Sequence, residues 1–210
     1  MLHPDSTQVL EELGKVLMKI NKTDEAINTY EKLIRIAPGN YHAWFGKAGA
    51  YLKAARWKEA VYCYEEAIHI RPDCYRSYYN MAAALEGLGN HEAAIDAYQS
   101  AIAINPDFAE AYNNLGILLS ITGRREDALE VYEEGIRRNK KHDGLYFNMG
   151  ICLHEEGKYM EAVTAYRNAL DLNPDELEIY YYLGAALTEM RNYNDAIDAY
   201  KSALKIKPSD

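Results

Sequence analysis

The sequence predicts an all-α fold, an α-solenoid of six helix-turn-helix repeats, on three observations. Each 34-residue stretch holds two apolar stripes with helical period. A fixed period of this length is typical of repeat units that bury their apolar faces only by stacking. Tyrosine and alanine recur with that period, at Tyr30, Tyr64, Tyr98, Tyr132, Tyr166 and Tyr200, and at Ala26, Ala60, Ala94, Ala128, Ala162 and Ala196.

The period fixes the phase of the whole 210-residue chain, because six residues followed by six units of 34 account for it without an insertion. We therefore expect one solenoid domain over residues 7–210, preceded by a lead-in over residues 1–6. The six repeats are residues 7–40, 41–74, 75–108, 109–142, 143–176 and 177–210.

The fifth unit shows the elements expected in every repeat. A first helix carries Leu145, Met149 and Leu153 on one stripe, and a second helix after Gly157 carries Ala162 and Tyr166 on another. Helices of about fourteen residues are marginal alone in water, so the units must stack.

Small residues recur at the eighth place of each unit. Glycine there costs about 0.5–1 kcal/mol relative to alanine inside a helix, so its recurrence indicates close packing, which we expect to be two helix backbones crossing. The series is Gly14, Ala48, Ala82, Gly116, Gly150 and Gly184.

The unit ends repeat as well. Prolines at Pro38, Pro72, Pro106, Pro174 and Pro208 are expected to stop the second helices, and Asp73, Asp107 and Asp175 to cap the helices that follow. The fourth unit instead ends with the basic run Arg137–His142. There we predict a looser joint and a local basic patch.

Composition limits the class of function. The net charge is −9, which argues against a general binder of nucleic acid or of anionic membranes. No signal peptide is visible in residues 1–6, and no apolar run is long enough to span a membrane. Three scattered cysteines fit a reducing compartment, so a cytoplasmic location is expected.

No motif predicts catalysis. The six histidines fall at unrelated places, with no metal-type spacing to one another or to the cysteines, and the glycines form no phosphate-binding loop. Adjacent acids such as Glu155 and Glu156 point to different helix faces. We expect no enzymatic activity, no cofactor and no metal.

The recurring small residues, alanines, tyrosines and prolines, with Trp44 in the second unit, resemble the tetratricopeptide repeat (TPR) over all of the chain beyond Ser6. The resemblance implies a right-handed superhelix in which the first helix of each unit lines a concave groove.

The resemblance puts the sixth place of each repeat in that groove. In three consecutive repeats this place holds Asn80, Asn114 and Asn148. An asparagine side chain both donates and accepts, so three in a row resemble the asparagine ladder with which some members of the family read a peptide backbone. The plainer alternative is that these side chains only solvate the groove.

The resemblance also places apolar and basic residues in the groove. The apolar row suggests an exposed binding patch, unless facing helices cover it. The carboxylate clamp of members that hold chaperone tails is missing. The groove residues are Phe45, Tyr79, Ile117, Ile121, Phe147, Ile151, Tyr181 and Tyr182, with Lys53 and Arg76 toward the first half.

The sequence therefore predicts an adaptor or scaffold that binds an extended peptide or partner segment in the groove. One alternative is the recruiting or regulatory arm of a larger enzyme, such as a glycosyltransferase. Another is a structural module that self-associates through its uncapped C-terminal helix, which carries Ile197, Tyr200 and Leu204.

Overall fold

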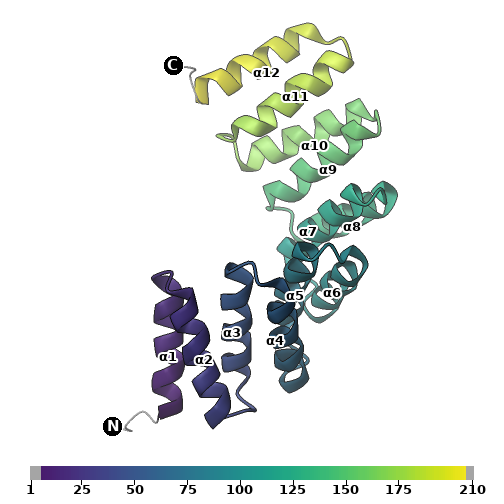
Figure 1. Ribbon diagram of the computed structural model, residues 1–210. Helices are drawn as coiled ribbons and strands as arrows, with labels where there is room; N and C mark the ends of the chain where they lie inside the picture. The colour runs from purple at the N-terminus through teal and green to yellow at the C-terminus, as the bar shows by residue number, and fades with distance from the viewer. Residues whose placement is uncertain (1–5, 207–210) are drawn as a thin grey trace. The chain divides into compact units, whose positions relative to one another are not determined.

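The structure, a computed structural model, describes residues 6–206 and contains helices and no strand in that range (Figure 1). The predicted all-α repeat fold is confirmed. The helices are α1 (Ser6–Lys19), α2 (Thr23–Ile36), α3 (Tyr41–Lys53), α4 (Trp57–Ile70), α5 (Tyr75–Gly87), α6 (His91–Ile104), α7 (Ala109–Ile121), α8 (Arg125–Arg138), α9 (Asp143–Glu155), α10 (Tyr159–Leu172), α11 (Leu177–Glu189) and α12 (Tyr193–Ile206).

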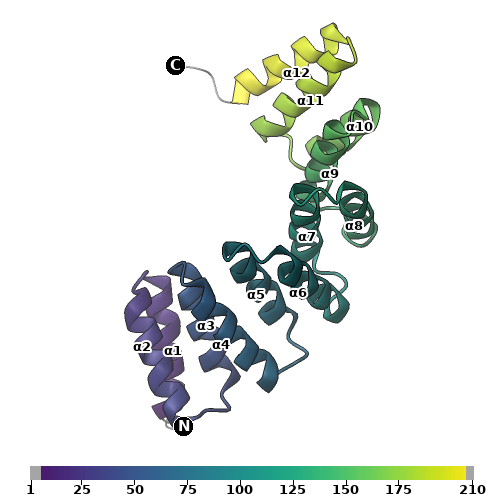
Figure 2. The same ribbon diagram turned by 45° about the vertical axis from the view of Figure 1, so that its right-hand side comes forward.

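The chain divides into two compact units, Met1–Asn105 and Pro106–Asp210, each with three helical hairpins (Figure 2). In each unit the odd-numbered helices follow one another in one layer, and each even-numbered helix packs on its own hairpin partner. Within the units, α2, α4, α8 and α10 also pack on the first helix of the next hairpin. The assignment of all six repeats to one domain stays a prediction. Helix α1 begins at Ser6, one residue before the expected repeat boundary, and Pro208 lies outside the described residues.

The turn inside every hairpin has the same geometry. One residue takes a positive φ, from 55° at Ala55 to 85° at Gly123, and the next N–H bonds to the carbonyl five residues back, as in Lys158 N to Leu153 O at 2.9 Å. This Schellman ending satisfies carbonyls at the end of the first helix. It recurs at Asn21, Ala55, Gly89, Gly123, Gly157 and Arg191.

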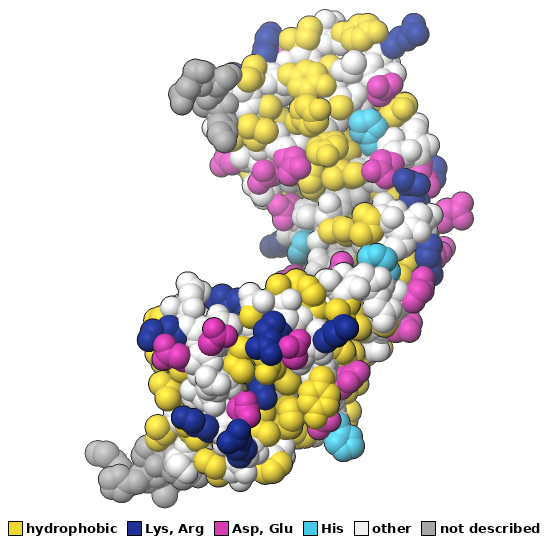
Figure 3. Space-filling model, viewed as in Figure 1, with side chains coloured by type: hydrophobic (Ala, Val, Ile, Leu, Met, Phe, Trp, Pro, Cys, Tyr) yellow, Lys and Arg dark blue, Asp and Glu magenta, His cyan; other side chains and the backbone are white. Residues whose placement is uncertain are grey.

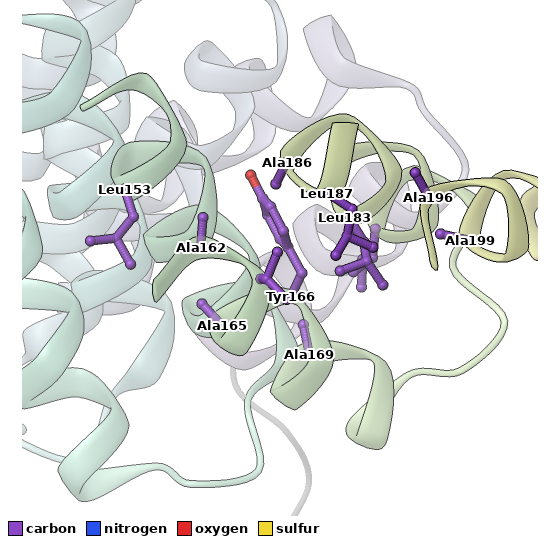
Figure 4. Packing of buried hydrophobic residues seen from close by; sticks show 12 residues of the cluster. Leu153, Ala162, Ala165, Tyr166, Ala169, Leu183, Ala186, Leu187, Ala196 and Ala199 are labelled. Carbon is purple, nitrogen blue, oxygen red and sulfur yellow. The ribbon is translucent and has the colours of Figure 1, made fainter. Parts of the chain in front are cut away.

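The recurring tyrosine explains the small residue at the eighth place. A Cβ atom on Gly150 would lie 2.5 Å from Cε1 of Tyr166, and one on Gly116 would lie 2.4 Å from Cε1 of Tyr132. The close approach is therefore between a tyrosine ring and a helix backbone, not between two backbones as expected. Figure 4 shows Tyr166 among the alanines and leucines of the cluster that joins α10 to α11 and α12.

The expected aspartate caps are wrong. The N-cap residues of α5, α7 and α11 are Cys74, Phe108 and Glu176, so each aspartate lies one residue too early, and none of these N-cap side chains accepts a capping bond. Side-chain caps occur instead at Asn40, which accepts from Ala43 N at 3.1 Å, and at His142, which accepts from Leu145 N at 3.3 Å.

Candidate functional site

The first helices of the second unit bring three asparagine side chains together. Nδ2 of Asn148 on α9 donates to Oδ1 of Asn113 on α7 at 2.8 Å, and Nδ2 of Asn113 donates to Oδ1 of Asn114 at 3.3 Å. All three side chains are half-buried. The result is a connected row of amides across two neighbouring repeats.

Asn113 was not among the residues predicted from the sequence. It stands at the fifth place of its 34-residue repeat, where the second, third, fifth and sixth repeats carry an aromatic residue. That interruption of the aromatic row, next to another asparagine, is a signal that could have identified it. Its contact with Asn148, 35 residues away, depends on the packing of α7 against α9.

Asn80 belongs to the first unit, where it lies on α5 against the second-helix tyrosine of the preceding repeat. Burial raises the pKa of Tyr64, and the neighbouring Asn80 side chain acts in the opposite direction. The alignment of Asn80 with Asn114 and Asn148 in a three-membered ladder stays a prediction.

Most of the predicted apolar residues are only half-exposed. Phe147 packs against Tyr182, with ring centroids 5.5 Å apart, and Phe45 packs against Tyr64 at 5.7 Å. The expectation of an open patch is therefore wrong for these two rings. Tyr79, Ile117 and Ile151 are likewise half-buried.

Two apolar side chains of the row do lie open. The exposed fraction is 55% for Tyr181 on α11 and 68% for Ile121 at the end of α7. Both lie in the second unit, which also holds the amide row. This unit therefore combines polar groups for hydrogen bonding with apolar surface for contact.

The two predicted basic residues differ in their surroundings. Nζ of Lys53 donates to Oδ1 of Asn21 and to the carbonyl of Met18 at 3.4 Å, so it ties the end of α3 to the turn after α1. Arg76 is exposed at the start of α5, and its guanidinium lies 5.6 Å from the centre of the Tyr75 ring.

The basic run after α8 lines a cavity of about 540 Å³. Arg138 is paired with Glu134 at 2.7 Å and lies 3.8 Å from Asp107, while Lys140 and Lys141 are exposed in the turn. Because Asp107 and Glu110 line the same cavity, its charge is mixed. The looser joint and the role of a basic patch stay predictions.

Among residues 6–206 no group of three or more histidine, cysteine, aspartate or glutamate side chains is arranged to hold a metal ion. No helix in this range is both long and apolar enough to cross a membrane.

Helical hairpins of 34 residues, with a tyrosine of the second helix packed on a small residue of the first, define a TPR protein. The chain belongs to the family of the cilia and flagella-associated protein 70 C-terminal domain, whose family model matches residues 4–209. A comparison of the sequence with curated proteins gives no match.

Solved TPR structures share the fold. The C-terminal part of a TPR repeat-containing protein from Cytophaga hutchinsonii is 18% identical, with a TM-score of 0.81 over 93% of this chain and 78% of that chain. PilF of Pseudomonas aeruginosa is 17% identical, with a TM-score of 0.78 over 97% and 93%. YrrB, described as a TPR protein with an unusual peptide-binding site, is 18% identical, with a TM-score of 0.68 over 86% and 93%.

Proposed function

We propose that this chain is a protein-interaction adaptor or scaffold, and that the first-helix face of its second unit binds an extended peptide segment of a partner protein. The observation that carries the proposal is the amide row formed by Asn113, Asn114 and Asn148. We assign the chain no catalytic role and no cofactor, and we propose that it acts in the cytoplasm. The family name favours a cilium or flagellum as its site of action.

The chemistry of the row suits a peptide backbone. The bond to Asn113 takes one N–H of Asn148 and leaves its second N–H and its carbonyl oxygen, one donor and one acceptor. An extended peptide presents an N–H and a C=O at each residue, so it matches this pair without regard to its side chains. YrrB, a protein of the same fold with a peptide-binding site, lends support by analogy.

The exposed apolar residues would add affinity and some sequence preference. Tyr181 and Ile121 are available to contact apolar side chains of a peptide, and large aromatic residues often dominate binding energy at interfaces. We therefore expect peptides with spaced apolar residues, held mainly through the backbone.

The test begins with peptides selected on the intact chain from a displayed random library. Calorimetry then compares a selected peptide with versions methylated at single backbone nitrogens. We expect at least one methylated version, and the Asn148→Ala chain, to bind about 10-fold more weakly, since one lost hydrogen bond of about 1.4 kcal/mol has that effect.

The matched control is Asn168→Ala, because Asn168 is exposed on the second helix α10. Its affinity should equal that of the unaltered chain. Equal binding by Asn148→Ala, together with indifference to every backbone methylation, would contradict the proposal.

Self-association through α12 is a second candidate, favoured by one observation. Ile197 is 49% exposed and Leu204 is 56% exposed, whereas Val163, at the place in α10 that matches Ile197, is buried. Exposed apolar residues that gather on one face often mark an interaction surface. Figure 3 shows hydrophobic side chains gathered over α11 and α12.

A further inference from the structure

Helix α1 and the residue after it present an apolar stripe to solvent. Val9, Leu13, Val16 and Ile20 are 45–56% exposed, and their spacing of four, three and four residues puts them on one face. The stripe has the residue spacing of the buried face of an amphipathic helix.

The same places are buried in later repeats. Val9 stands at the third place of its repeat and Val16 at the tenth. In α3, α5, α9 and α11 the residues at both of these places are buried. These residues are Ala43, Ser77, Leu145 and Ile179 at the third place and Ala50, Ala84, Cys152 and Ala186 at the tenth.

The contact that buries the third place is with the second helix of the preceding repeat. A Cβ atom on Gly135 of α8 would lie 3.2 Å from Cδ1 of Leu145 on α9. Ala203 of α12 stands at the place of Gly135, and Val9 of α1 stands at the place of Leu145. One chain thus carries both halves of a repeat-to-repeat contact, one on α12 and one on α1.

The charges beside the two faces also match. Between the last two repeats, Nη2 of Arg167 lies 3.8 Å from Oδ2 of Asp195. Lys201 occupies the place of Arg167 one repeat later, and Glu25 occupies the place of Asp195 in the first repeat. A second copy that followed α12 as a further repeat would bring Glu25 to Lys201.

We propose that α12 of one copy docks on the α1 stripe of a second copy, in the manner in which each second helix meets the next repeat. This inference rests on the self-association candidate and names its acceptor surface. The contact joins two different surfaces, so each copy keeps one free face and assembly continues beyond the dimer.

The test uses two blocked variants and light scattering across concentration. Val16→Glu places a charge in the α1 stripe, and Leu204→Glu places one on α12. Both positions are exposed, so helix content should not change, which circular dichroism checks. At high concentration the unaltered chain should exceed the mass of a dimer, whereas each variant alone should stay monomeric. An equimolar mixture of the two variants should reach the mass of a dimer and not exceed it.

Charge reversal gives an independent check. Lys201→Glu should weaken assembly, and adding Glu25→Lys in the same chain should restore it. Dimers of Val16→Glu alone would show α12 pairing with itself, and dimers of Leu204→Glu alone would show α1 pairing with itself. Either result, or a monomer at every concentration of the unaltered chain, would overturn the head-to-tail proposal. Neither variant alters Asn148, so peptide binding can be scored separately.

Discussion

Tyr98 and Tyr166 occupy the same place in their repeats, yet their hydroxyl groups meet different surroundings. The hydroxyl of Tyr98 donates to the carboxylate of Glu86, whereas that of Tyr166 is buried with no hydrogen-bond partner among the described residues. A buried hydroxyl without a partner costs free energy that a bonded one recovers.

We therefore expect the same substitution to have different effects on stability at the two tyrosines. Tyr98→Phe should lower the free energy of unfolding by about 1.5–3 kcal/mol, because it removes a hydrogen bond to a carboxylate. Tyr166→Phe should leave stability unchanged or raise it slightly. Urea denaturation measures both, and an equal loss in the two variants would contradict the assignment.

The three cysteines should differ in reactivity. Burial raises the pKa of Cys63 to about 11 and also raises that of Cys152. Burial acts in the same direction on Cys74, but hydrogen bonds from the Tyr41 hydroxyl and from backbone N–H groups at the start of α5 outweigh it and lower its pKa.

Because the thiolate is the reacting species, iodoacetamide at pH 8 should label Cys74 first. Tyr41→Phe should slow that labelling, since it removes a bond that stabilises the thiolate. Mass spectrometry of digested protein measures the rates at each cysteine. Faster labelling of Cys63 than of Cys74 would show that the surroundings of Cys74 are misjudged.

Among single residues, the sequence predicted which ones recur but not what they contact. The glycine series correctly indicated a close approach, yet the partner was a tyrosine ring from another helix. Periodicity says which residues share a face and does not say which distant side chain meets them. The same limit hid the bond between Asn113 and Asn148.

At the scale of the helices, one missing partner distinguishes the end of α8. Nδ2 of Asn173 at the end of α10 donates to Oδ2 of Asp143, the first residue of α9, at 2.8 Å. Asn139 holds the matching place after α8, but the first residue of α7 is Ala109, and Nδ2 of Asn139 is buried without a partner among the described residues.

Ala109→Asp should supply that partner. We expect the free energy of unfolding to rise by about 1 kcal/mol, since the new carboxylate can accept from Asn139 and also lies at a helix N-terminus. Thermal or urea unfolding measures it. The control is the same substitution in an Asn139→Ala background, where a gain of equal size would mean that the hydrogen bond plays no part.

Helix positions were the best predicted feature, because every repeat reports the same pattern independently. The aspartate caps failed because the turns after α4, α6 and α10 place the aspartate one residue before the N-cap. A shift of one residue is invisible to a pattern that only marks where a turn occurs. The positive φ at Ala55 and Arg191 could not be predicted either, because alanine and arginine, unlike glycine, do not favour a positive φ.

At the scale of the whole chain, the 34-residue period decided the fold class and the protein class. Exposure was harder to predict, because it depends on how far neighbouring helices cover each side chain. Phe45 and Phe147 were placed correctly on first helices but proved half-buried, whereas the exposed stripe on α1 went unnoticed because its residues look like those of any buried face.

Binding of a peptide backbone by the amide row in the second unit can be observed atom by atom. The measurement is nuclear magnetic resonance of the asparagine side-chain amides while a selected peptide is added. We predict large shifts for Asn113, Asn114 and Asn148, and none for Asn168 on α10. Shifts confined to Asn168 and other second-helix residues, with the row unchanged, would contradict this function.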